Sequence, residues 1–171
     1  MPVTTLKYIL FALISLLSCS VTAQTDGAEA VTEEWFAVTR VVDGDTFWAE
    51  DSHGNSIKIR LIGVDAPEPR NTGTKPKRFF GAESTNYLRQ LLNDKKVRLE
   101  YDVSRYDRYR RTLAYAYLED GTFVNAELVK HGYATVMTVP PNVKHHETFT
   151  RLAAKARNQK RGLWKGPPST K

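Results

Sequence analysis

The segment from Val41 to Thr46 reads VVDGDT, and the segment from Arg60 to Glu68 reads RLIGVDAPE. Each segment places a pair of carboxylates directly after a short apolar run, and the second segment begins with an arginine. Carboxylate oxygens are the ligands that a hard divalent cation prefers, and a guanidinium can bind a phosphate through two parallel hydrogen bonds. The two segments together therefore favour a metal-assisted site that acts on a phosphodiester.

Each segment also has a purely structural interpretation. Asp43-Gly44 is a common hairpin turn, and the prolines around Glu68 are typical of a plain turn. An EF-hand is excluded, because Phe47 stands where its third oxygen ligand belongs and no glutamate occupies the twelfth position. Both acidic pairs follow apolar strands, and Arg60 precedes Asp65 by five residues. This coincidence favours a functional site over two unrelated turns.

Residue patterns around these segments predict short strands and a few helices. Alternation predicts a hairpin at 35–42 and 46–50, and further strands at 57–61, 97–101 and 112–118. The strand at 57–61 places Arg60 on the face away from the core, together with Lys58. In 112–118 large and small residues alternate, which suits a small tapering barrel. Helical spacing of apolar residues predicts helices at about 80–93 and 124–131, and a last one with an apolar stripe from Phe149 to Ala156.

The first residues resemble an export signal. Lys7 precedes an apolar run, Tyr8–Leu17, which is too short to span a bilayer, and cleavage after Ala23 suits an ordinary signal peptide. The alternative is a lipoprotein anchored at Cys19, the only cysteine, so that no intramolecular disulfide can form. We expect a signal peptide at 1–23, a flexible segment at 24–34, one folded domain at 35–165 and a flexible tail at 166–171.

The chain of 171 residues is basic, with a formal net charge of +6. Its densest cationic run alternates arginines with Tyr106 and Tyr109 between Arg105 and Arg111, and a second basic loop spans Arg70–Arg78. A solvated charged surface and a nucleic-acid contact surface both fit these runs. The histidines at 131, 145 and 146 have no cysteine partner in the mature chain and are expected at the surface rather than in a zinc site.

At this point the residues resemble a known family, that of staphylococcal nuclease (thermonuclease). The resemblance covers Val38–Trp164 and rests on five motifs in order: Val42-Asp43-Gly44-Asp45-Thr46; Arg60-Leu61-x-x-Val64-Asp65-x-Pro67-Glu68; Asp107-x-Tyr109-x-Arg111-x-Leu113-Ala114-Tyr115; Val124-Asn125-x-x-Leu128-Val129; and Arg161-Gly162-Leu163-Trp164. It implies a mainly β fold with helices (α+β), an OB-fold made of a five-stranded Greek-key barrel with three helices. It also implies Ca²⁺-dependent hydrolysis of DNA and RNA to 3′-phosphate and 5′-hydroxyl ends.

The resemblance assigns roles to particular residues. Asp45, Asp65 and the backbone carbonyl of Ala66 would ligate Ca²⁺, with Asp43 acting through water. Glu68 would be the general base, and Arg60 and Arg111 would bind the scissile phosphate. The residues expected to contact nucleic acid are Arg108, Tyr109, Arg110, Lys75, Lys77 and Arg78.

Three positions depart from the family pattern. Ala66 replaces a common threonine, but only its carbonyl is needed. Arg110 replaces a glycine, so its side chain either strains the backbone or adds a phosphate contact. Met137 and Val139 stand where well-known members have tyrosines near the nucleotide base.

The sequence therefore predicts an exported endonuclease that is indifferent to the sugar. Its partners would be DNA and RNA, preferably single-stranded or locally open, and the protein would be a monomer. Two alternatives stay open: an OB domain that binds nucleic acid without cutting it, and a basic cell-envelope binding protein. The first would have lost the acids that are retained here, and the second leaves them unexplained.

Overall fold

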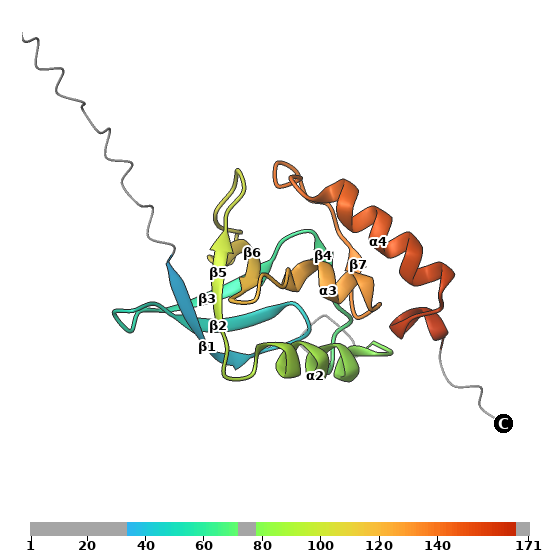
Figure 1. Ribbon diagram of the computed structural model, residues 1–171, viewed down its shortest axis with the longest axis horizontal. Helices are drawn as coiled ribbons and strands as arrows, with labels where there is room; N and C mark the ends of the chain where they lie inside the picture. Colours follow the sequence, from blue (N-terminus) through green and yellow to red (C-terminus); the bar gives the residue numbers. More distant parts are fainter. Residues whose placement is uncertain (1–33, 72–77, 167–171) are drawn as a thin grey trace, which may run out of the picture. The chain divides into compact units, whose positions relative to one another are not determined.

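Five strands close into a barrel in the computed structural model of this protein, which describes residues 34–71 and 78–166 (Figure 1). Around the barrel the order is β1 (Trp35–Val41), β2 (Thr46–Glu50), β3 (Ser56–Leu61), β6 (Thr112–Leu118) and β5 (Lys96–Glu100). Neighbouring strands are antiparallel except β3 and β6, which are parallel, and β5 pairs with β1 to close the barrel. The predicted OB-fold is confirmed.

Helices surround this barrel. They are α2 (Gly81–Leu92), α3 (Val124–Lys130), α4 (His146–Asn158) and a short 3₁₀ helix, η1 (Gly162–Lys165). α2 contacts β1, and α3 lies between β6 and α4 (Figure 1). The described segments hold no helix that combines the length and hydrophobicity needed to cross a membrane. The predicted signal peptide, Lys75, Lys77 and residues 167–171 lie outside the described residues.

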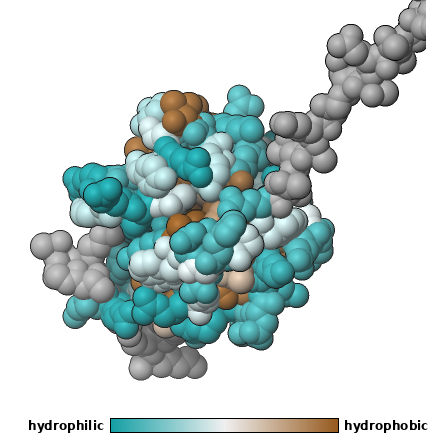
Figure 2. Space-filling view, turned by 90° about the vertical axis from the view of Figure 1, so that its left-hand side faces the viewer, coloured by the Kyte–Doolittle hydropathy of each residue, from teal (hydrophilic) through white to brown (hydrophobic). Residues whose placement is uncertain are grey.

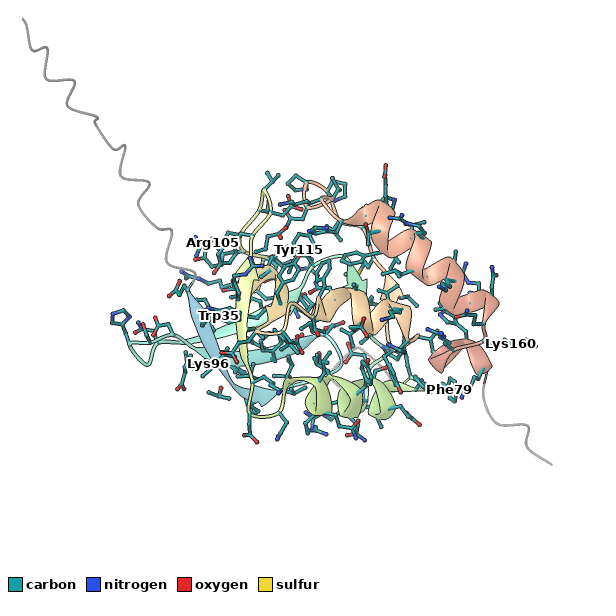
Figure 3. The ribbon with its side chains drawn as sticks, viewed as in Figure 1. Trp35, Phe79, Lys96, Arg105, Tyr115 and Lys160 are labelled. Atoms are coloured by element: carbon teal, nitrogen blue, oxygen red, sulfur yellow. The ribbon has the colours of Figure 1, made fainter. Side chains whose placement is uncertain are left out.

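The alternation predicted for the strands divides the interior of the barrel from its outer face. Phe47 on β2 and Ile59 on β3 are fully buried inside it, opposite the small Ala114 and Ala116 of β6. Tyr115, between those alanines, faces outward and is buried against Phe149 of α4 (Figure 3). The large residues of β6 thus attach the barrel to α4 and leave the small ones inside.

Two features differ from the sequence predictions. A two-stranded ribbon, β4 (Val64–Asp65) paired with β7 (Thr135–Val136), was not predicted, because neither strand is long enough to show a pattern. His145 was expected at the surface, but its side chain is only 22% exposed. Its ring packs edge-on against Tyr115 at a centroid distance of 4.5 Å, and its Nε2 lies 2.9 Å from Glu100 Oε1. His145 is the residue directly before α4.

Candidate active site

A cleft of about 570 Å³ opens between the β5–β6 loop and the loop from β7 to α4. It gathers nine of the residues predicted for the site: Asp43, Asp45, Arg60, Asp65, Ala66, Glu68, Arg108, Tyr109 and Arg111. These residues come from three separate parts of the chain. The structure therefore brings the two acidic pairs and the arginines together, as the sequence predicts.

The β1–β2 turn sets the position of the first acidic pair. The backbone N–H groups of Val42 and Asp43 both donate to the carbonyl of Thr46, at 2.9 and 3.3 Å. Gly44 is packed so closely that a Cβ there would collide with the side chains of Ala66 and Ser84. A glycine is therefore required for this turn to lie against the second acidic segment.

Asp45 is the most deeply buried acid of the cleft, with 6% of its surface exposed. Its Oδ2 accepts a hydrogen bond from the backbone N–H of Ala66 at 2.8 Å and lies 3.1 Å from Nη2 of Arg60. Its Oδ1 accepts from the hydroxyl of Thr46 at 3.1 Å. Burial raises the pKa of Asp45 to about 7, although Arg60 opposes the shift, and neighbouring Asp43 adds to it. The environment of Asp45 thus favours its neutral form more than water does.

Arg60 is held in place by backbone as well as by acids. Its Nη1 donates to the carbonyls of Leu61 and Val64, at 2.7 and 2.8 Å. Its Nη2 is shared between Asp45 and Asp65, at 3.1 and 3.4 Å. The sequence predicts Arg60 on the ligand-facing side of β3, and it does line the cleft, but both terminal nitrogens are engaged by protein groups.

The second acidic segment is held from two sides. β4 pairs Asp65 with Thr135 of β7, and the Thr135 hydroxyl donates to the Asp65 carbonyl at 3.1 Å. The Asp65 side chain is one-third exposed, and Nη1 of Arg78 lies 3.8 Å from it. Glu68 lies half-buried in the cleft, and the start of α2 packs on its backbone so closely that a Cβ at Gly81 would collide with the Glu68 carbonyl.

Asp107 holds Arg111 in position, a role that the sequence did not predict although Asp107 belongs to one of the five motifs. Its Oδ2 accepts from Nε of Arg111 at 2.7 Å, and its Oδ1 accepts from the backbone N–H groups of Tyr109 and Arg111 at 2.9 and 3.0 Å. Partial burial opposes the charge, but these hydrogen bonds hold the pKa of Asp107 below its ordinary value. The four-residue spacing from Asp107 to Arg111 was the available signal.

The outer residues of the cleft complete its walls. Arg108 donates to the Tyr109 hydroxyl at 2.7 Å and lies 4.8 Å from its ring centroid. Met137 and Val139, which are 38% and 57% exposed, form an aliphatic part of the opposite wall. The two walls are joined by Asn142, whose side chain accepts from Ser104 N at 2.7 Å and donates to Ser104 O at 2.8 Å.

Whether this cleft suits a cation follows from its donor chemistry. Within residues 34–71 and 78–166, no group of three or more His, Cys, Asp or Glu side chains is arranged to hold a metal ion. The donors are nevertheless of the right kind, since the oxygens of Asp43, Asp45 and Asp65 line one cleft. The residues therefore fit a hard divalent cation.

Arg110 is exposed and does not line the cleft, and its φ of 62° is in the left-handed region.

We expect Arg110→Gly to stabilise the protein by up to about 1 kcal/mol, because a left-handed conformation costs a non-glycine residue about 1–2 kcal/mol, offset in part by the flexibility of glycine. Thermal unfolding measures the change. Arg105→Gly in the same loop is the control, and it should lower the melting temperature. Weaker oligonucleotide binding by Arg110→Gly at low salt would instead identify Arg110 as a phosphate contact.

Comparison with known proteins gives consistent matches. The family described as "Staphylococcal nuclease homologue" matches residues 58–166. The chain is 38% identical over 138 residues to a protein named thermonuclease from Staphylococcus hyicus, covering 81% of this chain and 80% of that protein. It is 38% identical over 131 residues to the thermonuclease of Staphylococcus intermedius, covering 77% and 76%. It is also 37% identical over 127 residues to an uncharacterized endonuclease of Escherichia coli O157:H7, covering 74% of each.

Proposed function

Since this chain belongs to the staphylococcal nuclease family and is a nuclease, we propose that it is an exported, Ca²⁺-dependent endonuclease indifferent to the sugar. It would cut DNA and RNA to 3′-phosphate and 5′-hydroxyl ends. The observation that carries this proposal is the cleft that gathers the acids Asp45, Asp65 and Glu68 with Arg60 and Arg111.

Cleavage of a phosphodiester needs positive charge near the phosphate, an oriented water and stabilisation of the charge that builds up at phosphorus. Asp45, Asp65 and the Ala66 carbonyl would hold Ca²⁺ directly, with Asp43 acting through water. Bound there, the ion would supply positive charge next to the phosphate. A cation that neutralised Asp45 and Asp65 would leave the Nη2 hydrogens of Arg60, which these two acids share in the structure, available to a phosphate oxygen.

Glu68 would act as the base. Its carboxylate would orient a water and accept its proton while the water oxygen bonds to phosphorus and the bond to the 5′ oxygen breaks. The leaving oxygen then takes up a proton and becomes the 5′-hydroxyl. The half-buried position of Glu68 in the cleft supports this role.

The two arginines would bind the phosphate from different elements. Arg60 lies on β3, and Arg111 lies at the end of the β5–β6 loop, where Asp107 holds its Nε. In the described part of the chain neither terminal nitrogen of Arg111 has a hydrogen bond, so both can meet the transition state. Arg108 and Tyr109 would contact the chain beside the scissile bond. The burial of Asp45 within the cleft favours a single-stranded or locally open substrate over an intact duplex.

The route out of the cell is also part of the proposal. Residues 1–23 would be removed as a signal peptide. The mature protein would be a monomer with one folded domain at 35–165. Anchoring through a lipid on Cys19 is the alternative. Mass spectrometry of the mature N-terminus distinguishes the two, because cleavage after Ala23 removes Cys19.

Incubation of the mature protein with plasmid, single-stranded DNA and RNA, in Ca²⁺ and in a chelator, tests the activity. We expect cutting of all three in Ca²⁺, with 5′ ends that a kinase labels without prior phosphatase treatment. Mg²⁺ should substitute poorly, because it demands tighter octahedral geometry and holds its waters. Cutting that persists in chelator would exclude the calcium role, and binding without cutting would favour the non-catalytic alternative.

Calcium should stabilise the protein more at pH 8 than at pH 5. Burial raises the pKa of Asp45 from 3.8 to about 7. Between pH 5 and about pH 7, the folded, metal-free protein therefore keeps a proton on Asp45 that the unfolded chain has already lost. Raising the pH through this interval therefore destabilises the metal-free protein, while it produces the carboxylate that a cation binds. Melting temperatures with Ca²⁺ and with chelator at both pH values measure the effect. Equal Ca²⁺ shifts at pH 5 and pH 8 would contradict it.

A further inference from the structure

Three neighbouring strands carry two cations and an aromatic residue in one row on the outside of the barrel. The β1–β2 register places Arg40 beside Trp48, and the β2–β3 register places Trp48 beside Lys58. Phe47 and Ile59, next to Trp48 and Lys58 in sequence, are fully buried inside the barrel. Because successive side chains of a strand point to opposite faces, Trp48 and Lys58 face outward.

The three side chains contact one another. The guanidinium carbon of Arg40 and Nζ of Lys58 each lie 6.0 Å from the ring centroid of Trp48. Neither cation has an ion pair among the residues that the structure describes. A cation–aromatic contact leaves the positive charge uncompensated, so both charges remain available to an anion.

This row continues into the cleft. The parallel β3–β6 register pairs Ile59 with Thr112, and Lys58 and Arg111 are the residues directly before this pair, Lys58 on β3 and Arg111 in the loop that enters β6. Arg111 lines the cleft. With about 4.8 Å between neighbouring strands, Lys58 on β3 and Arg40 on β1 lie about 10 Å apart across β2. We call Arg111, Lys58, Trp48 and Arg40 the outer strip.

The chemistry of the outer strip points to an occupant. Nε1 of Trp48 is buried and has no hydrogen-bond partner within the described residues, so the indole offers its ring and not its N–H. Figure 2 shows the side on which β1 and the β2–β3 turn lie in Figure 1, and its coloured surface is predominantly hydrophilic, with apolar residues in small patches. A charged surface with one aromatic ring suits a polyanion that carries bases better than an apolar protein surface.

We propose that the outer strip binds the single-stranded stretch of substrate that leaves the cleft, with phosphates against Lys58 and Arg40 and a base against the ring of Trp48. This proposal rests on the proposed function, because the occupant is the substrate. Ring contacts and phosphate contacts are the same for every base and either sugar. The outer strip therefore adds affinity for long chains without adding sequence preference.

The test compares a fluorescent oligo(dT) 3-mer, which fills only the cleft, with a 12-mer, which reaches across the strip. Binding is measured in chelator, so no cutting occurs. For Arg40→Gln/Lys58→Gln we expect the ratio of 12-mer to 3-mer affinity to fall at least about tenfold at low salt. The slope of log affinity against log salt for the 12-mer should fall by about 1.4, or about 0.7 per lost contact. Arg151→Gln/Lys155→Gln on α4 removes the same charge elsewhere and should change neither quantity.

A second readout follows Trp48 itself. The 12-mer should quench the tryptophan fluorescence of the wild-type protein, and Trp48→Phe should lose most of this quenching although Trp35 and Trp164 remain. Trp48→Phe should also retain more 12-mer affinity than Trp48→Leu, and melting curves confirm that both variants fold.

An unchanged affinity ratio and salt slope in the double variant, or full quenching in Trp48→Phe, would overturn the proposal that the outer strip binds the substrate. Failure of the proposed function would give a different result. The wild-type protein would then cut none of the nucleic acids in Ca²⁺, while the binding measurements in chelator would still decide whether the strip holds the 12-mer.

Discussion

Asp45→Asn should abolish Ca²⁺-dependent cutting, with a loss of at least about 10³-fold, and leave the metal-free protein at least as stable as the wild type at pH 8. Losing a residue that only orients a metal ligand costs about 10–100-fold, and a charged ligand contributes more. Stability should persist because burial disfavours the Asp45 charge, which raises its pKa to about 7. The amide oxygen can still accept from the N–H of Ala66 and from Nη2 of Arg60, and the amide nitrogen can donate to the Thr46 hydroxyl.

The measurements are the cutting rate and the melting temperature, each with Ca²⁺ and with chelator. Asp94→Asn, an exposed change outside the cleft, is the control and should keep both the activity and the Ca²⁺ shift. A variant Asp45→Asn that still cuts in Ca²⁺ at the wild-type rate would remove Asp45 from the metal site.

Arg111→Ala should lower kcat by about 10²–10³-fold, or about 2.7–4 kcal/mol in barrier, with a smaller change in KM. Asp107 already holds Nε of Arg111, so the terminal nitrogens are placed before the substrate arrives. Charge builds up on the phosphate oxygens only as the reaction proceeds, so the loss should appear mainly in the chemical step. Arg111→Lys should restore little activity, because an ammonium lacks the planar two-point contact.

Single-turnover kinetics on a defined oligonucleotide separate this step from product release. Arg105→Ala is the matched control, since Arg105 (labelled in Figure 3) lies in the same loop. Its guanidinium lies 3.9 Å from the ring centroid of Tyr101, and Arg105 does not line the cleft. Near-native turnover by Arg111→Lys would disprove two-point recognition of the phosphate.

Local patterns predict most of this fold. The hairpin at Asp43-Gly44, the inward side of each barrel strand and the three helices depend on alternation, helical spacing and turn residues, which act over a few neighbours. The grouping of the two acidic pairs was also predictable, because each follows a strand that ends at a turn. Interactions between residues close in the chain therefore account for most of the features that the sequence predicts.

Long-range packing could not be predicted in the same way. The burial of Arg60 depends on carbonyls at 61 and 64 and on Asp45 across the β2–β3 pair. The ring of His145 is held by Glu100 and Tyr115, which lie far from it in sequence. The strain at Arg110 was left open as one of two alternatives, and only its backbone angle favours the first.

The short β4–β7 ribbon makes the site depend on the order of synthesis. Asp65 is paired with Thr135, so a growing chain that has not yet reached that residue lacks one of the two supports of its second acidic segment. The barrel strands and all the acids of the cleft come earlier, before residue 119. A nascent or truncated chain can therefore contain every catalytic side chain and still lack a finished site. Hydrolytic activity should emerge only when the last quarter of the polypeptide has been made and folded onto the rest.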